Sequence, residues 1–303
     1  MSKIKFGVTI NAAPEMIYQS NYDSIKKIAQ ECERLGYDSL WVMDHLLWGV
    51  FNEGSVFEVW TLLTALATET ESIKLGPLVA CNSFRNPTLT AKIASTFDII
   101  SNGRLIFGYG AGWKEEEYEA YGFRFGDPVV RVNQMREGIT LIKMLWTEEK
   151  TSFQGDFYEA KDAICKPKPM QKPHPPIMIG GGGEKYTLKV AAEIANIWNV
   201  WGSSIEEYKR KVNILKGYCD KLGRKMDDIE LSWSGNILIG KNEEQLNKKI
   251  SRYGKDISFV CTYDSCIEKL QEYIDAGCKE FIFSLYTFND EKENFMEEIA
   301  SSF

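Results

Sequence analysis

Two polar residues follow directly after a short apolar run near the start of the chain. The run SLWVMD at 39–44 ends on Asp44, and His45 comes next. An imidazole titrates near neutral pH, so His45 is suited to donate a proton, accept one, or stack on a ring. The alternative is a structural histidine hydrogen-bonded to Asp44. We take His45 and Asp44 as candidate catalytic residues and keep the structural alternative open.

Four consecutive glycines at 180–183 follow another apolar run and precede a helical pattern. A strand, a glycine turn and a helix form the arrangement in which backbone N–H groups bind a phosphate. Because four glycines lose much conformational freedom on folding, a purely structural explanation is disfavoured. No G-K-[ST] follows, which excludes the P-loop of nucleoside triphosphatases. We expect a phosphate site here, with Lys185 or Lys189 adding positive charge.

A second glycine pattern occurs at Gly108, Gly110 and Gly112, where Trp113 follows. The spacing is G-x-G-x-G, so the dinucleotide fingerprint G-x-G-x-x-G is not met. These glycines more simply allow the backbone to approach a flat ligand closely. Three acids at 115–117 then begin a helix, where the helix dipole favours negative charge. We expect at least two of the three to be solvated.

The segment VACNSFRNP at 79–87 follows a third apolar run. Asn82 and Ser83 have the groups needed to hydrogen-bond the edge of a heterocycle. Arg85 either binds an anion or lies on the surface at a helix start, and both alternatives stay open. Asn86 followed by proline is typical of a helix that begins with Pro at its first position.

Eight short apolar runs alternate with amphipathic stretches along the chain, and they must position these residues. The runs lie at 5–10, 39–44, 73–80, 104–110, 176–180, 196–201, 230–240 and 280–286. This alternation predicts an α/β fold, a parallel (β/α)8 TIM barrel forming a single domain over residues 1–303. Function in such barrels collects at the C-terminal ends of the strands, where the candidate residues are found.

The fourth and fifth runs are separated by an insertion at about 147–176. Aromatic residues at 153, 157 and 158 alternate around Gly155-Asp156, which predicts a β-hairpin. The rest of the insertion is rich in proline and should be extended.

Composition excludes several classes of protein. The net charge of −7 argues against a nucleic-acid partner. Seven cysteines without C-x-x-C spacing disfavour a disulfide framework, and reduced thiols predict a cytoplasmic location. His174 precedes a strand, at the opposite end of the barrel from His45, so we expect it to be structural and expect no metal site. The start MSKIKFGVTINAAPE predicts neither a signal peptide nor a membrane span.

Three blocks of sequence together resemble the luciferase-like monooxygenases. They are LGYDSLWVMDHLLW, FRNPTLTAKIASTFDIISNGRLIFGYGAGWKEEEYEAYG and PKPMQKPHPPIMIGGGGEKYTLKVAAEIANIWN, and the likeness extends over about residues 4–286. Within the family the chain most resembles the branch of deazaflavin (coenzyme F420)-dependent oxidoreductases. The resemblance implies a (β/α)8 barrel with the isoalloxazine ring in its mouth and the phosphate tail directed outward.

The resemblance also assigns roles to individual residues. His45 and Asp44 match a D-H pair beside the ring, and Leu78-Val79-Ala80 lies where family members often carry a cis peptide. The cofactor-binding residues it implies are Val79, Ala80, Asn82, Gly110, Gly180, Gly181, Gly182 and Gly183. We place Trp48, Trp113 and Glu116 in the substrate pocket. Trp113 stands where sugar-phosphate dehydrogenases of the family carry an acid, which puts sugar-phosphate oxidation in doubt.

Several functions are compatible with these observations. The first is hydride transfer between coenzyme F420 and a small organic substrate, with His45 assisting protonation. The second uses FMN, reduced by a separate flavin reductase, for monooxygenation with O2. A third is a flavin-binding barrel without turnover, and a glycosidase is disfavoured because no isolated pair of carboxylates follows two strands. By analogy with the family we expect a homodimer.

Overall fold

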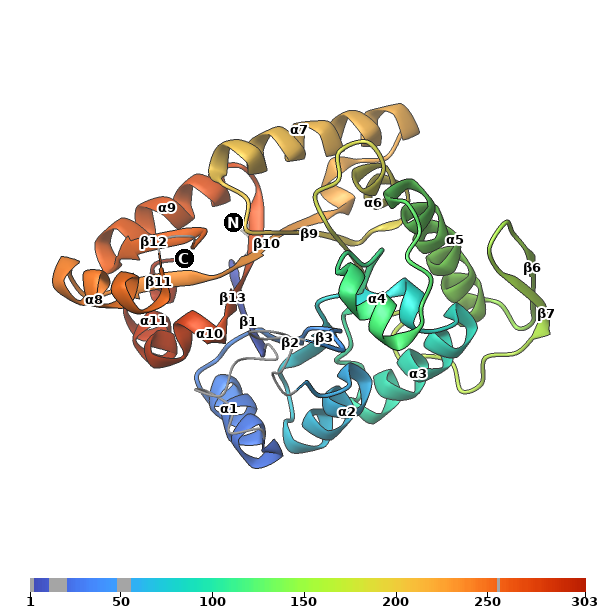
Figure 1. Ribbon diagram of the computed structural model, residues 1–303, viewed down its shortest axis with the longest axis horizontal. Coiled ribbons are helices and arrows are strands. Elements are labelled where there is room, and N and C mark those ends of the chain that lie inside the picture. The colour runs from blue at the N-terminus through green and yellow to red at the C-terminus, as the bar shows by residue number, and fades with distance from the viewer. Residues whose placement is uncertain (1–2, 11–20, 48–55, 255–256) are drawn as a thin grey trace.

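Parallel strands form a nearly closed barrel in the computed structural model, which describes residues 3–10, 21–47, 56–254 and 257–303 (Figure 1). Nine strands form one sheet in the order β3-β2-β1-β13-β10-β9-β8-β5-β4. Their bounds are β1 Lys5–Ile10, β2 Ser39–Val42, β3 Lys74–Pro77, β4 Ala80–Cys81, β5 Phe107–Gly110, β8 Ile177–Gly180, β9 Ile197–Trp201, β10 Glu230–Gly235 and β13 Cys278–Ser284.

The two ends of this strand order meet. β4 follows β3 along the chain after only Leu78 and Val79. The N–H of Leu75 in β3 donates to the carbonyl of Arg104 at 3.0 Å, and the N–H of Ile106 donates to the carbonyl of Leu75 at 2.9 Å. The segment before β5 therefore pairs with β3, while β5 itself pairs with β4. The predicted TIM-barrel fold is confirmed, and β3 and β4 together occupy one strand position of the barrel.

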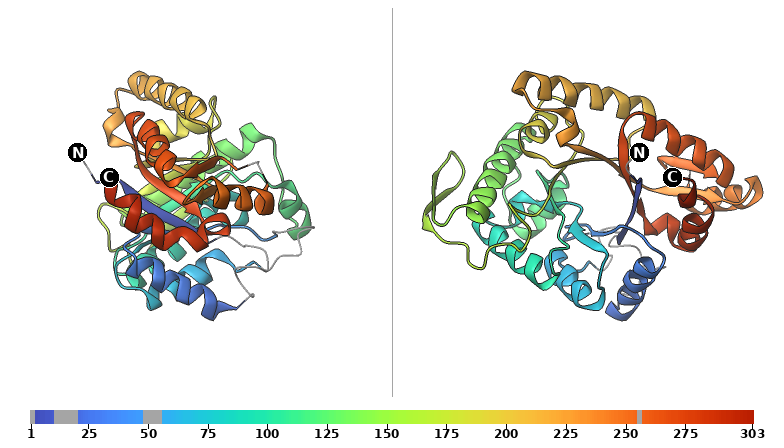
Figure 2. Two further views of the ribbon diagram at one scale, coloured as in Figure 1. Left: turned by 90° about the vertical axis from the view of Figure 1, so that its left-hand side faces the viewer. Right: turned by 180° about the vertical axis from the view of Figure 1, so that it is seen from behind.

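Helices surround the barrel in both views of Figure 2. Their bounds are α1 Tyr22–Arg34, α2 Val59–Glu69, α3 Pro87–Ile100, α4 Glu115–Tyr121, α5 Pro128–Thr147, α6 Thr187–Ile194, α7 Ile205–Leu222, α8 Glu243–Tyr253, α9 Tyr263–Asp275, α10 Leu285–Phe288 and α11 Lys292–Glu298. The predicted start of α3 is confirmed, since the Asn86 side chain accepts from the N–H of Thr88 and Pro87 is the first helical residue. This cap satisfies an N–H group that the helix itself cannot bond.

Side chains along β13 show how the core is divided. Phe281 and Phe283 contact aromatic residues of the surrounding helices, including Tyr273 of α9 and Phe295 of α11. Because side chains of a strand alternate between faces, Ile282 faces the interior of the barrel. There it belongs to a small apolar cluster with Trp41, Leu78, Met178 and Ile197.

The predicted hairpin is confirmed within the insertion. β6, Thr151–Gln154, pairs antiparallel with β7, Glu159–Ala163, and the hairpin projects beside α5 (Figure 1). The Glu137 carboxylate of α5 accepts hydrogen bonds from the N–H groups of Asp156 and Phe157, each at 2.9 Å. One carboxylate therefore anchors the turn to the barrel.

The prediction of one strand over 230–240 is wrong. β10 ends at Gly235, and the next strand, β11 Ile237–Gly240, leaves the barrel to pair with β12, Phe259–Thr262, in a separate two-stranded sheet. A Cβ atom at Gly235 would lie 2.6 Å from the Trp233 ring, so glycine lets the backbone pass this ring where the two strands separate. An unbroken apolar run carries no sign of such a division.

The described residues also bear on membranes, metals and thiols. All seven cysteines are free and buried. Over these residues no helix has the length and apolar character needed to cross a membrane. The same part of the chain contains no group of three or more His, Cys, Asp or Glu side chains arranged to hold a metal ion.

Candidate functional site

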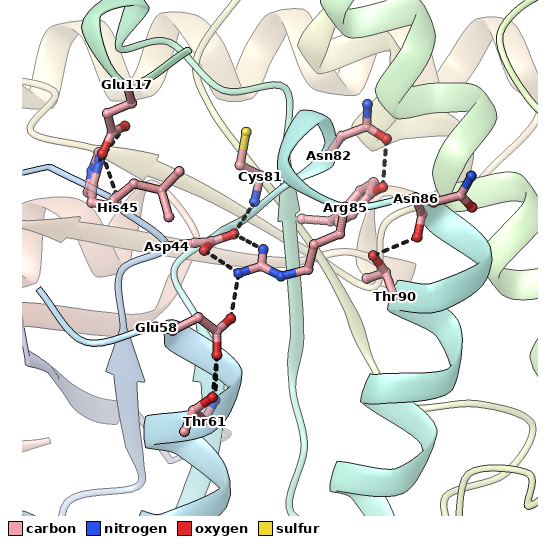
Figure 3. A network of polar contacts seen from close by, with 12 residues as sticks. Asp44, His45, Glu58, Thr61, Cys81, Asn82, Arg85, Asn86, Thr90 and Glu117 are labelled. Carbon is pink, nitrogen blue, oxygen red and sulfur yellow. Dashed lines mark hydrogen bonds and ion pairs between the residues drawn. The ribbon is translucent and has the colours of Figure 1, made fainter. Parts of the chain in front are cut away.

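The Asp44 carboxylate, just beyond β2, is the centre of a buried ionic network (Figure 3). It accepts from the N–H of Cys81 at 2.8 Å and from both terminal nitrogens of Arg85 at 2.7 and 3.0 Å. Arg85 also donates to Glu58, the cap of α2, at 2.6 Å. The network joins the end of β2 to β4 and α2, so the Asp44 side chain has a structural role that its sequence position did not reveal.

The electrostatics of this network follow from burial and pairing. Burial raises the pKa of Asp44, and the hydrogen bonds from Arg85 and Cys81 oppose this effect. Burial lowers the pKa of Arg85, but its bonds to Asp44 and Glu58 outweigh burial, so the pKa of Arg85 is raised. Arg85 is therefore not a free surface arginine, because protein carboxylates are its partners, and contact with a ligand anion stays a prediction.

His45 is paired with Glu117 of α4 and not with Asp44, which corrects the structural alternative considered for it. Its Nδ1 lies 3.0 and 3.1 Å from the two carboxylate oxygens of Glu117. Burial raises the pKa of Glu117, but hydrogen bonds from His45 and the Leu46 and Leu47 amides outweigh it, so the pKa is lowered. The Trp113 ring meets the imidazole edge-on, with the ring centroids 5.8 Å apart.

The predicted pocket residues have different surroundings. Glu116 is exposed, and its neighbour Glu117 is the buried acid of the three, 2% exposed. Sequence reasoning therefore missed Glu117. Trp113 is 65% exposed, and its place in the wall of the substrate pocket stays a prediction. Trp48 lies outside the described residues.

The peptide bond between Leu78 and Val79 is cis, at the place that the family resemblance implied. The Val79 side chain lies against two of the predicted cofactor glycines. A Cβ atom at Gly110 would be 2.5 Å from Cγ2 of Val79, and one at Gly180 would be 2.8 Å from Cγ1. These glycines therefore make room for Val79 between β5 and β8, whereas the sequence suggested a flat ligand at Gly110 and a phosphate at Gly180.

Asn82 is engaged with tyrosines. Its side-chain oxygen accepts from the Tyr109 hydroxyl at 2.6 Å, and its amide nitrogen donates to the Tyr158 hydroxyl at 2.9 Å. Tyr158 belongs to the hairpin insertion, so Asn82 connects β4 to that insertion. Asn82 is 1% exposed and bonded to both tyrosines, and its contact with a heterocycle edge stays a prediction.

The glycine turn after β8 presents its carbonyl groups to the protein. The Gly181 carbonyl accepts from Nε1 of Trp198 at 3.0 Å, the Gly182 carbonyl from Nζ of Lys211 at 2.9 Å, and the Gly183 carbonyl from the Leu188 N–H at 3.0 Å. Among the described residues, no acceptor binds the N–H of Gly182 or Gly183.

The turn is suited to an anion, and its basic residue comes from α7. Gly181 has a φ of +126°, which L side chains rarely adopt, and its N–H donates to the Asn199 carbonyl at 2.9 Å. Unpaired N–H groups in the turn that leads into helix α6 favour a negative group. Lys211 is nearly buried beside the turn, while the predicted Lys185 and Lys189 are exposed. A lysine within the otherwise apolar buried face of α7 was the signal available in the sequence.

Comparison with known proteins identifies the family of the chain. The family described as luciferase-like monooxygenase matches residues 4–276. The chain belongs to this family. The prediction that the protein is an enzyme is thereby confirmed, because its family and its relatives are oxidoreductases and monooxygenases.

Two relatives of this chain depend on different cofactors, according to their names. An F420-dependent glucose-6-phosphate dehydrogenase from Intrasporangium calvum is 33% identical over 305 residues, covering 89% of this chain and 90% of that protein. An FMNH(2)-dependent dimethylsulfone monooxygenase from Pseudomonas putida is 30% identical over 207 residues, covering 66% of this chain and 56% of that protein.

A solved structure shows the same fold at lower identity. An F420-dependent secondary alcohol dehydrogenase in complex with an F420-acetone adduct matches with a TM-score of 0.85 and 18% identity, covering 98% of each chain. At this identity the likeness supports the barrel architecture alone.

Proposed function

We propose that the protein transfers a hydride between coenzyme F420 and a small organic substrate. The observation that carries the proposal is the glycine turn, whose carbonyls bond inward while the N–H groups of Gly182 and Gly183 bond no described acceptor. The I. calvum relative, which aligns over most of both chains, is F420-dependent. Because Trp113 replaces the acid expected in sugar-phosphate dehydrogenases, we do not extend that relative's substrate to this chain.

The residues present fit a cofactor with a phosphate group. A Cβ atom at Gly183 would lie 2.8 Å from Oγ1 of Thr187, so a larger residue would force the turn or Thr187 to move. Gly182 and Gly183 would hold the phosphate beside Lys211, whose Nζ also lies 3.6 Å from Glu184 and 3.5 Å from Glu207. Val79 and Ala80 would support the ring, and His45 would hold or deliver a proton. When bound, the deazaflavin supplies the hydride chemistry.

A second candidate keeps the site and changes the cofactor to reduced FMN, with O2 as oxidant and a separate flavin reductase as partner. The P. putida relative favours it. Two assays separate the candidates. Under anaerobic conditions the F420 proposal predicts a substrate-dependent loss of the absorbance of oxidised F420 for some member of a panel of small alcohols. Substrate-dependent O2 uptake with reduced FMN, and no reaction with F420, would instead establish the monooxygenase.

The Gly181→Ala substitution should weaken cofactor binding. Alanine is strained at the positive φ of Gly181, so the turn must change shape and move its N–H groups. We expect the Kd for F420, measured by fluorescence titration, to rise about tenfold or more, equivalent to the loss of one charged hydrogen bond. Gly217→Ala is the matched control, because a Cβ at Gly217 of α7 meets nothing within 4 Å. Equal affinities of the two variants would contradict the assignment of the turn.

A further inference from the structure

The Glu117 carboxylate contacts both the His45 ring and the backbone that carries it. One oxygen accepts from the N–H of Leu46 at 2.6 Å and from the N–H of Leu47 at 2.9 Å. Both oxygens lie within hydrogen-bond distance of Nδ1 of His45. The side chains of His45 and Glu117 are 12% and 2% exposed, so solvent competes little for these bonds.

The chemistry of these partners determines where the imidazole proton resides. An ionised carboxylate only accepts hydrogen bonds, and its two amide bonds already favour the ionised form of Glu117. Nδ1 of His45 must then be the donor, and in the neutral ring the lone pair is on Nε2. A histidine side chain in water prefers the opposite tautomer, with the proton on Nε2, so the protein has to impose this one.

We infer that Glu117 is the positioning residue of the site, holding His45 in the Nδ1–H tautomer and fixing the loop after β2 on which the ring is carried. The inference rests on the proposed function in one respect, namely that His45 exchanges a proton during the reaction. With Glu117 in place, the lone pair of the neutral ring is on Nε2, and the orientation of the ring is set before a reactant arrives.

Other charged groups near His45 and Glu117 either have other partners or are exposed. Asp44 is bonded to Arg85, and Nζ of Lys114 donates to the Leu47 carbonyl at 2.7 Å. Glu115 and Glu116 are exposed on α4. Glutamine cannot replace Glu117 fully, because it offers one acceptor oxygen to three donors and turns an NH2 group toward the others.

Nitrogen NMR of the histidine rings tests the inference directly, because the chain has only two histidines. His174, whose Nδ1 lies 2.8 Å from the Pro175 carbonyl, should also be an Nδ1–H tautomer and serves as an internal reference. Long-range 1H–15N spectra of the full-length protein would be recorded at a pH where both rings are neutral. A His174→Gln variant assigns the two ring systems.

We expect Nδ1–H to predominate at His45 in the wild-type protein. In Glu117→Ala the ratio of Nδ1–H to Nε2–H at His45 should fall by about tenfold or more, the effect of losing a charged hydrogen bond. Glu117→Gln should show an intermediate ratio, and it supplies the measurement if the alanine variant does not fold. The matched control Glu119→Ala removes an exposed acid from the same helix and should leave both rings unchanged.

Two results would overturn the inference: a wild-type His45 that is mainly Nε2–H, or a His45 tautomer ratio that is the same in the wild-type and Glu117 variants. These outcomes differ from a failure of the proposed function. Lack of binding to both F420 and FMN would refute the function and leave the NMR result for Glu117 intact.

Discussion

Asp44→Asn is expected to destabilise the protein by ~3 kcal/mol, because it leaves a buried guanidinium without its main partner. The Arg85 side chain is 13% exposed, and two of its nitrogens bond the Asp44 carboxylate. Asparagine retains the volume but offers one acceptor and turns an NH2 group toward Arg85 or Cys81. The measurement is the free energy of unfolding from urea denaturation, monitored by circular dichroism.

Two further variants show whether the effect comes from the buried pair. Glu58 is the more exposed partner of Arg85, 42% exposed, so Glu58→Gln should reduce stability by less than about 1 kcal/mol. In a double-mutant cycle with Arg85→Gln, the combined variant should be more stable than the sum of the single effects predicts, by about 2 kcal/mol. A loss of stability at Asp44 no larger than that at Glu58 would show that the buried Asp44–Arg85 pair is not the main source of the effect.

Glu280→Gln should make the protein more stable at alkaline pH by ~3 kcal/mol. Glu280 of β13 is buried in the barrel interior, and one of its oxygens accepts from the Ser39 hydroxyl at 2.8 Å. Among the described residues the other oxygen has no partner, and nearby Lys5 bonds Glu230 instead. Burial, with the charge of Glu230, raises the pKa of Glu280 from its usual 4.5 to about 7, although Ser39 and Lys5 oppose this.

The direction of the pH effect follows from these two pKa values. Below about pH 4.5 the carboxyl is protonated in both the folded and the unfolded protein, so stability is unaffected. As the pH rises toward 7 the unfolded chain releases this proton and the folded protein retains it, so the wild type loses stability progressively. The glutamine variant lacks this titration. We therefore expect the two stability curves to lie close together at pH 5 and to separate by pH 8.5.

The difference between the two stability curves isolates Glu280, because all other groups titrate in both proteins. Glu244→Gln, which removes a carboxylate that is 79% exposed, controls for the change in net charge. If the Glu280→Gln and wild-type curves run parallel from pH 5 to 8.5, Glu280 does not carry an elevated pKa.

The sequence predicts the barrel and the approximate positions of its strands, because both depend on local patterns. The alternation of apolar runs and helical stretches yielded the fold, and Gly155-Asp156 with its flanking aromatics yielded the hairpin. One strand, β11, was hidden for a local reason too. β11 continues the apolar run of β10, and only the Trp233–Gly235 contact shows where the chain leaves the barrel.

The partners within the site depend on contacts between distant segments, which no local pattern specifies. Asp44 and Arg85 are 41 positions apart, and His45 and Glu117 are 72 apart. The choice of Glu116 over Glu117 shows the difficulty, because three adjacent acids on a seven-residue helix differ only in which face they occupy. Asn82 looked available for a ligand because its tyrosine partners come from β5 and the insertion.

The most direct measurement of the central claim is cofactor binding to the wild-type protein. The purified protein would be titrated separately with F420 and with oxidised and reduced FMN, and binding followed by fluorescence. The proposed function predicts saturable binding of F420 that is tighter than binding of either form of FMN and is weakened by Gly181→Ala. Tighter binding of reduced FMN would contradict hydride transfer with F420 and favour the monooxygenase, and binding of none of them would contradict the cofactor site at the glycine turn.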